Sequence, residues 1–338
     1  MHQRFQTLLF CFLLLRGSFL FAQDPIFSQF YAAPLQLNPA FTGTAQAPFI
    51  AANYRMQYPS FVSGAAYSTF AISYDQGLRQ SNSAIGISIM TDDAGQGIFK
   101  KTYASALYSY KVNIREDIQA KIGVEAGLIQ SSLNWDKLVF YDQLDPITGG
   151  FNPDGTPRPT QEVRPTELNN SLFDLSTGLL INAQNFYVGV SAKHLATPNE
   201  GFINANQNLR VGLPIRWSLH GGYEITLKKG NRSRPKSFVT PSLLVVKQSD
   251  FLQVVGGAYA GFGSIFTGLW YRQTPSNSES VIFTVGFRQD YFKVGYSYDF
   301  PVGVFGTKTG GSHELSLTIN LDPNPRKYDL NDCYQMFR

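Results

Sequence analysis

The chain has 338 residues, of which 15% are charged and 14% aromatic, and its formal net charge is +4. The charged fraction is well below the roughly 25% of an average soluble domain, and the near balance of charge argues against a nucleic-acid partner. Only two cysteines are present, and Cys11 falls in a leader that we expect to be removed, so neither an intrachain disulfide nor a cysteine-based metal site is predicted.

Residues 1–22 have the layout of a secretory signal peptide. Arg4 precedes an apolar run from Leu8 to Leu15, and small and apolar residues follow down to Ala22. We expect cleavage between Ala22 and Gln23 and export through the Sec pathway. The apolar run is too short to span a bilayer, which takes about 20 helical residues. A retained membrane anchor is therefore not predicted.

Residues 23–48 form a separate segment ahead of the first predicted strand. Pro34 and Pro39 bias Ala33 and Asn38 toward extended backbone and prevent one continuous helix. The aromatic side chains of the segment need an apolar surface to cover them. Two alternatives stay open: a plug packed in or under the domain that follows, or a periplasmic arm that docks a partner.

An alternation of apolar and polar residues recurs from residue 49 to residue 321. It is clearest at 215–228 and repeats at 119–128, 292–300 and 314–321. After Ala22 no stretch reaches the ~18 apolar residues of a membrane helix. A membrane protein without such a helix satisfies its backbone in lipid as a closed barrel. The sequence thus predicts an all-β, antiparallel up-and-down transmembrane β-barrel whose apolar face meets lipid, as in a Gram-negative outer membrane.

Segments of about ten residues between turn signals give fourteen predicted strands, and an even number suits an antiparallel barrel. The predicted strands are 49–58, 65–76, 84–92, 102–113, 118–131, 172–182, 185–194, 214–228, 236–247, 251–261, 264–273, 280–289, 291–300 and 312–321.

The lengths of the connections favour the same strand count, because bacterial barrels have short periplasmic turns and longer extracellular loops. If the first strand starts in the periplasm, every connection longer than seven residues lies outside. This orientation puts both ends of the chain in the periplasm, including the tail 322–338. It puts the proline-rich loop 132–171 outside, where we expect the main external contact surface.

No catalytic, cofactor or metal site is predicted, and we expect a protein that is not an enzyme. His194, His220 and His313 lie on separate predicted strands, and none has a second His or Cys at ligand spacing. No Gly-x-Ser-x-Gly elbow is present. Ser312, His313 and Glu314 are sequence neighbours whose alternating directions argue against a preformed triad.

Polar residues on the inward face of the predicted strands leave the state of the lumen open. Charged residues such as Lys121, Glu125 and Asp299 would either line a wet channel or pair with one another in a closed barrel. An outer-membrane channel, or a hydrophobic-substrate transporter with a plugged lumen, is therefore an alternative function.

Motifs at both ends of the mature chain point to one family. Residues 23–44 read QDPIFSQFYAAPLQLNPAFTGT, Tyr54-Arg55 is followed by Gln57-Tyr58, and VGYSYDF and GGSHELSL stand at 294–300 and 310–317. These stretches resemble the PorP/SprF family, outer-membrane proteins of the type IX secretion and gliding apparatus of Bacteroidetes. The positions that carry the resemblance and become candidates for partner contact are Phe27, Gln29, Phe30, Asn38, Pro39, Ala40, Gly43, His313 and Glu314.

The resemblance implies a non-enzymatic component of the type IX protein secretion or gliding machinery. It implies that the chain supports export or surface anchoring of secreted adhesins. The implied partners are outer-membrane lipids, proteins of the machinery, and a large adhesin bound through its C-terminal domain. The chain continues for 17 residues beyond Leu321. This departs from the family pattern, in which the chain stops close to the last strand.

Overall fold

The computed structural model describes residues 23–45, 47–60, 66–144, 152, 154, 156, 158–202, 212–229, 236–274, 279–289, 291–302, 309–322 and 337. The predicted signal peptide 1–22 and residues 323–336 of the predicted tail lie outside this part of the chain. Within the described residues, no helix is both long and apolar enough to cross a membrane.

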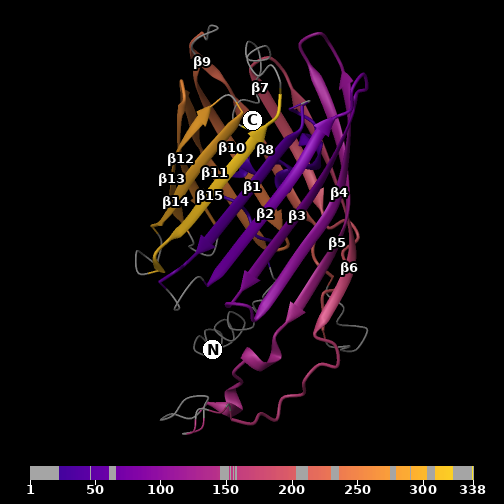
Figure 1. Cartoon of the computed structure of the whole chain (residues 1–338), viewed down its shortest axis with the longest axis vertical. Helices are drawn as coiled ribbons and strands as arrows, with labels where there is room; N and C mark the ends of the chain where they lie inside the picture. The colour runs from indigo at the N-terminus through magenta and orange to yellow at the C-terminus, as the bar shows by residue number, and fades with distance from the viewer. Residues whose placement is uncertain are drawn as a thin grey trace, which may run out of the picture.

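One antiparallel sheet closes on itself as a barrel (Figure 1). Strands that follow one another in sequence pair with each other, with one exception described below, and the last strand pairs with the first. The strands are β1 (Phe49–Gln57), β2 (Tyr67–Gly77), β3 (Ser83–Ala94), β4 (Phe99–Asn113), β5 (Gln119–Leu133), β6 (Asn169–Asn182), β7 (Phe186–Lys193), β8 (Arg216–Tyr223), β9 (Ile225–Lys228), β10 (Ser237–Gln248), β11 (Phe251–Phe262), β12 (Ile265–Gln273), β13 (Ser280–Gln289), β14 (Phe292–Pro301) and β15 (Ser312–Asn320).

The strands follow from the period of the sequence. In β3, Ile85, Ile87 and Ile89 point outward, and Ile87 is 57% exposed, while the alternate residues Ala84 and Ser88 are buried. Such a wall of exposed apolar side chains is unfavourable in water but is solvated by lipid in a membrane barrel. The outward apolar face and the inward polar face therefore agree with the prediction.

The fourteen predicted strands are confirmed, and their bounds agree with the structure to within three residues, apart from one interruption. The predicted strand 214–228 is divided into β8 and β9, which lie one after the other beside β10. Between them Glu224 is buried, and its carboxylate accepts a hydrogen bond of 2.6 Å from Lys236 Nζ. Glu224 faces inward in phase with the alternation of the strand, and the register on β10 continues across the break, with Gly222 opposite Ser242 and Ile225 opposite Val239. Pro241 lies on β10 between these pairs and has no N–H to donate to the ladder.

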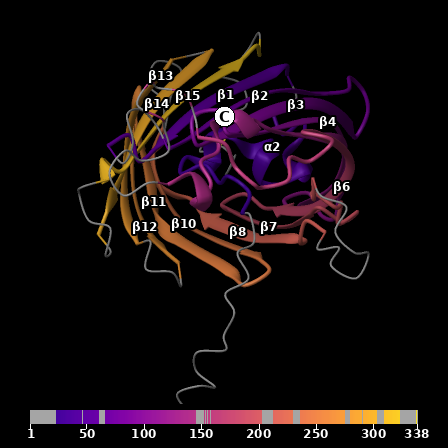
Figure 2. The same ribbon diagram turned by 90° about the horizontal axis from the view of Figure 1, so that it is seen from below.

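Residues 24–45 lie inside the barrel (Figure 2). They form three short turns of helix, η1 (Phe30–Ala32), α2 (Pro34–Leu37) and η2 (Pro39–Phe41), and each of the two prolines begins a new turn. Of the two alternatives for 23–48, these described residues therefore form a plug. We use the word plug for residues 24–45.

The plug packs on aromatic side chains of the barrel wall. The ring of Tyr31 stacks on Trp270 with a centroid distance of 5.4 Å and meets Tyr259 edge-on at 5.2 Å. Trp270 in turn donates a hydrogen bond of 3.2 Å from Nε1 to Ser242 Oγ. Large aromatic rings contribute most to such a core, so the lumen is a packed interior along the plug.

The plug runs in a direction that the sequence did not indicate. Asp24 hydrogen-bonds to Gln248, where β10 ends at the long-loop end of the barrel. Gly43 hydrogen-bonds to Asp75 at the short-turn end, close to the start of β1. The start of the predicted mature chain therefore lies at the long-loop end, not beside the short turns as we expected.

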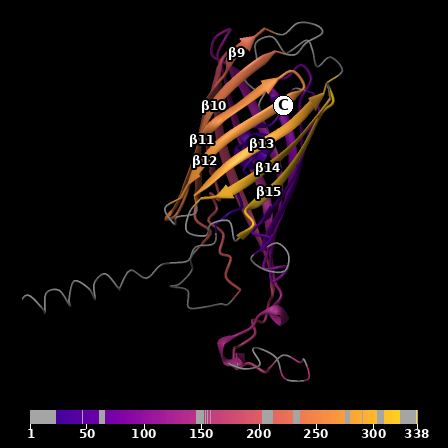
Figure 3. The same cartoon turned by 90° about the vertical axis from the view of Figure 1, so that its left-hand side faces the viewer.

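Part of the long loop 132–171 has defined structure. It carries the turns η3 (Trp135–Lys137) and η4 (Tyr141–Gln143) and projects well beyond the barrel (Figure 3). The rings of Trp135 and Phe140 lie 4.7 Å apart. These contacts within the loop organise part of it.

Candidate functional site: the plug and its seat in the barrel wall

The first anchor of the plug is the pair Ser28 and Gln29. Their backbone N–H groups donate to the two carboxylate oxygens of Glu314 on β15, at 2.8 and 2.9 Å. The Gln29 side chain donates to the Glu314 backbone oxygen at 3.1 Å and accepts from Ser316 Oγ at 2.7 Å. Hydrogen bonds to an ionised group are stronger than neutral ones, so this carboxylate fixes the plug to the wall.

Four buried charged side chains surround that anchor. Arg55 lies 2.8 Å from Asp299 and 3.1 Å from Glu314, and Arg272 lies 2.8 Å from the same Asp299 oxygen. The hydroxyl of Ser28 donates to that oxygen at 2.7 Å. Two positive and two negative charges balance, as buried charges require. We call Arg55, Arg272, Asp299 and Glu314 the ion cluster.

A second anchor lies at the very start of the plug. The carboxylate of Asp24 is 2.6 Å from His194 Nε2 and 3.4 Å from Arg216, and Asp174 contacts the other ring nitrogen of His194 at 2.8 Å. His194 follows β7 directly, with a backbone φ of 64°, which is costly for a residue with a side chain. The surrounding contacts hold it there.

The charges at this second anchor shift the titration of both partners. Burial tends to raise the pKa of Asp24, but His194 and Arg216 outweigh it and hold the pKa below its usual value. Burial tends to lower the pKa of His194, but Asp24 and Asp174 outweigh it and raise the pKa. The pair is therefore charged over a wider pH range than either side chain alone.

The Asn38-Pro39-Ala40 triplet sits against three glycines of the wall. Asn38 Oδ1 accepts from Ala40 N at 2.8 Å, and its Nδ2 donates to the backbone oxygens of Leu179 and Val190, both at 3.1 Å. The plug approaches β5, β6 and β7 so closely that a Cβ on any of the three facing glycines would crowd the triplet or a side chain beside it. These glycines are Gly123, Gly178 and Gly189.

The plug ends in a turn at the short-turn end of the barrel. Thr42 O accepts from Ser109 Oγ at 2.8 Å and from Lys121 Nζ at 2.5 Å. Gly43 adopts φ +66°, and its N–H donates to Asp75 at 2.6 Å. Glycine meets this left-handed backbone without the cost that a side chain would add, so Gly43 is required by the turn.

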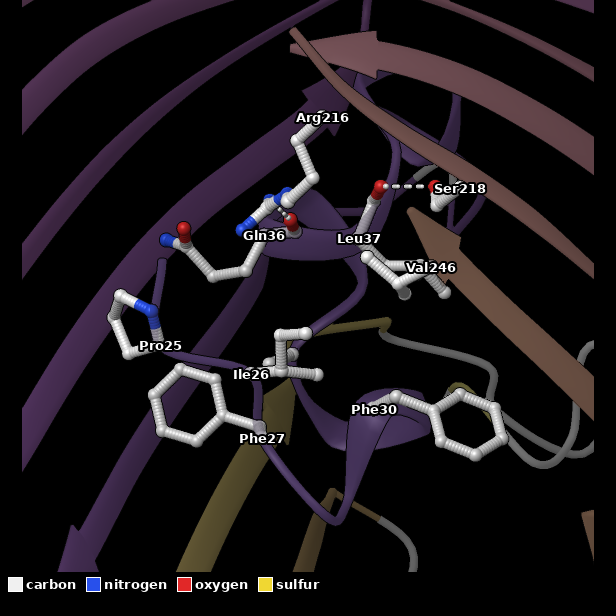
Figure 4. A pocket seen from close by; sticks show the side chains of 10 residues that line it. Pro25, Ile26, Phe27, Phe30, Gln36, Leu37, Arg216, Ser218 and Val246 are labelled. Carbon is white, nitrogen blue, oxygen red and sulfur yellow. Dashed lines mark hydrogen bonds between the residues drawn. The ribbon is translucent and has the colours of Figure 1, made fainter. Parts of the chain in front are cut away.

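A small cavity of about 30 Å³ lies between the plug and strands β8 and β10 (Figure 4). Arg216 donates to Gln36 O at 3.1 Å on one side, and Ser218 donates to Leu37 O at 3.4 Å on the other. A space of this size holds about one water molecule.

The described residues offer no other ready chemistry. Among them, no group of three or more His, Cys, Asp or Glu side chains is placed to hold a metal ion. Some of the polar groups of the lumen hold the plug, and others pair within the wall, as Lys193 and Glu125 do at 3.0 Å.

Comparison with known proteins assigns the chain to a family. Residues 19–319 match the family model described as type IX secretion system membrane protein PorP/SprF. The chain belongs to this family. It is thus an outer-membrane barrel associated with type IX secretion, and no curated protein matches it.

Solved structures resemble this PorP/SprF chain only distantly. A FadL homologue from Pseudomonas aeruginosa is 13% identical, with 84% of this chain and 93% of that chain covered and a TM-score of 0.41. BamA from Haemophilus ducreyi lacking POTRA domains 1–3 is 9% identical, with coverage of 81% and 69% and a TM-score of 0.38. A mutant of the Rh. blastica porin is 7% identical, with coverage of 81% and 99% and a TM-score of 0.35.

The residues that carry the PorP/SprF resemblance are brought together inside the barrel, with one exception. The candidates in the plug are Phe27, Gln29, Phe30, Asn38, Pro39, Ala40 and Gly43, of which Gly43 is partly exposed and the others are buried. Glu314 meets Gln29 from the wall. His313 instead points outward, where its ring hydrogen-bonds to Tyr296 at 2.8 Å. The candidate role of these residues in partner contact stays a prediction, and the plug residues make it only if the plug moves.

Several residues of the site were not singled out from the sequence. Arg272 joins the ion cluster, and the three glycines make room for the triplet. Inward-facing charge on a predicted strand was the signal available for Arg272. The three glycines could have been found because they occupy inward-facing positions on neighbouring strands, where most other positions carry a polar side chain.

Proposed function

We propose that this PorP/SprF-family chain is a non-enzymatic component of the type IX machinery that supports export or surface anchoring of secreted adhesins. It does so through contacts at the ends of the barrel rather than by passing a substrate through the lumen. The observation that carries the proposal is the plug, which occupies the lumen and is bonded to the wall at both ends. A channel or hydrophobic-substrate transporter would require the plug to move, because the cavity beside it holds about one water.

The long loop offers a surface for a protein client. Tyr141 is 91% exposed and Val163 is 82% exposed, so both display apolar area outside the barrel. The carboxylate of Asp142 accepts from the Thr160 hydroxyl at 2.9 Å and from Gln161 N at 2.6 Å, which ties the two limbs of the loop together. Tyrosine is among the residues enriched in protein–protein interfaces, where it offers a large amphipathic contact area.

The test is to delete the gene and compare proteins on intact cells with proteins in the medium by mass spectrometry. We expect one or a few large adhesins to be lost from the surface and retained inside or released. Unchanged surface proteins would refute the proposal.

Complementation then tests the loop. The double variant Tyr141→Ser and Val163→Ser should fail to restore the adhesin, although the barrel reaches the outer membrane. The control Glu162→Gln changes an exposed polar side chain on the same loop and should restore it. Full restoration by both variants would exclude this surface while leaving the secretion role in place.

A further inference from the structure

An aromatic cluster at the short-turn end of the lumen includes one residue from the C-terminal end of the chain. Phe337 is 1% exposed. Its ring lies 4.4 Å from that of Phe41 in the plug and meets Tyr187 of β7 edge-on at 5.0 Å. The ring of His220 on β8 stacks on the ring of Phe41, with a centroid distance of 5.3 Å. Phe337 is thus enclosed by the plug and by two strands.

The location of this contact is not a consequence of chain connectivity. The C-terminal tail leaves the barrel at β15, whereas Tyr187 lies on β7. In the fourteen-strand ring β7 stands seven places from β15, on the opposite side of the barrel. Phe337 therefore contacts wall residues on the side of the barrel opposite β15, the last strand before it in the chain. This indicates a specific point of attachment for the C-terminal end.

The walls of the cluster are fixed without Phe337. Asn38 holds the plug to β6 and β7 and also lies 3.2 Å from His220 Nε2. A Cβ at Gly222 would overlap the Tyr187 ring, so this glycine leaves the ring its place. Edge-on and offset ring pairs of this kind are favourable beyond the area that they bury. Phe41 and Tyr187 are therefore held in place by contacts other than those to Phe337.

We propose that Phe41, Tyr187 and His220 form a binding site for a single phenylalanine side chain carried on a C-terminal peptide, and that Phe337 of the same chain occupies it. Occupation of the site covers Phe41, the last ring of the plug, from the short-turn side. It thereby couples the C-terminal end of the chain to the Asn38-Pro39-Ala40 triplet. This binding is independent of the proposed secretion role.

The proposal predicts that the site accepts the peptide in trans once the tail is removed. The chain ending at Asp322 is purified in detergent, and a fluorescent peptide of residues 323–338 is titrated while anisotropy is measured. We expect the peptide to bind the shortened chain and not the full chain. Phe337→Ala in the peptide should weaken binding at least about tenfold, since burial of a Phe side chain contributes one to two factors of ten.

Matched variants separate a specific site from general stickiness. Tyr187→Ala in the shortened chain should weaken binding as Phe337→Ala does, whereas Tyr334→Ala in the peptide should leave it unchanged. Equal binding of the native and Phe337→Ala peptides would overturn the proposal, as would binding that is lost with Tyr334→Ala alone.

A full-length variant keeps the test valid if the shortened chain does not fold. In full-length Phe337→Ala the emptied site should capture the native peptide, and amide hydrogen exchange at residues 39–42 should become faster. If the peptide is not captured and exchange is unchanged, the contact of Phe337 with the lumen has no binding role.

Discussion

The ion cluster supports the sharpest prediction, because its charges balance only as a set. Asp299→Asn keeps the shape of the side chain but removes the charge that faces Arg55, Arg272 and the Ser28 hydroxyl. Two guanidinium groups would then share the single carboxylate of Glu314 in a buried site. Removal of one partner of a buried ion pair typically costs about 3–5 kcal/mol. We therefore expect this substitution to destabilise the plugged barrel by an amount of that order.

A second substitution tests whether charge balance is the cause. Arg272→Gln added to Asp299→Asn restores one positive and one negative charge, and so the double variant should be more stable than Asp299→Asn alone. The free energy of unfolding would be measured in detergent by urea titration, with unfolding followed by the gel mobility of the folded barrel. Hydrogen exchange at Ser28 and Gln29 would report the attachment of the plug in the same samples.

The matched control lies outside the barrel. Asp136→Asn removes the exposed ion pair with Arg164, and exposed pairs contribute little. Its stability should be unchanged within error. If the double variant is no more stable than Asp299→Asn, or if Asp299→Asn itself behaves like the control, the reasoning about the ion cluster is wrong.

Three further predictions concern the fit, titration and tightness of the plug. Gly178→Val should destabilise the barrel by about 1–3 kcal/mol or prevent its assembly, because a Cβ at this position overlaps Asn38. Gly256→Ala is the control and should fold normally, because its Cβ meets only Leu243, at 3.7 Å. Equal midpoints of urea unfolding for the two variants would contradict the close fit. Because the pKa of Asp24 is lowered in the folded protein, Asp24 adds stability above about pH 4, and this stability is lost as pH falls through its folded-state pKa. Because the pKa of His194 is raised, His194 adds stability below about pH 6.5, and this stability is lost as pH rises through its folded-state pKa. Hydrogen exchange at residues 24–27, corrected for the intrinsic rate, should therefore be slowest between these limits, and a profile without such a minimum would count against this anchor. In planar bilayers the native chain should show no steady conductance and a chain lacking residues 24–44 should conduct; an open native channel would favour the transporter alternative.

The barrel could be predicted from the sequence because lipid imposes a simple rule on every strand. Each outward position must be apolar and each inward position can be polar, so the period-2 pattern gives both the strand and its face. The break at Glu224 could not be predicted in this way. It lies opposite Pro241 of β10, which becomes a neighbour only after the sheet has formed.

The plug shows where sequence reasoning ends. Its prolines indicated short turns and its aromatic residues indicated that something must cover them. Its place inside the barrel, however, depends on contacts such as that of Asn38 with the Leu179 backbone, which is 141 positions away in the sequence. The loop-length rule sorts connections between strands and has nothing to say about a segment before the first strand. The expectation that the start of the mature chain lies beside the short turns was therefore an extension of the rule beyond its reach.

In this structure the plug threads the barrel and brings the start of the mature chain to the long-loop end. Cysteine labelling of intact cells with an impermeant maleimide tests this path, in a background in which Cys333→Ser removes the remaining mature cysteine. Gln23→Cys should label as readily as Tyr141→Cys in the long loop, while Glu116→Cys in a short turn should label only after the outer membrane is opened. If Gln23→Cys follows Glu116→Cys instead, the plug does not run through the barrel in this direction.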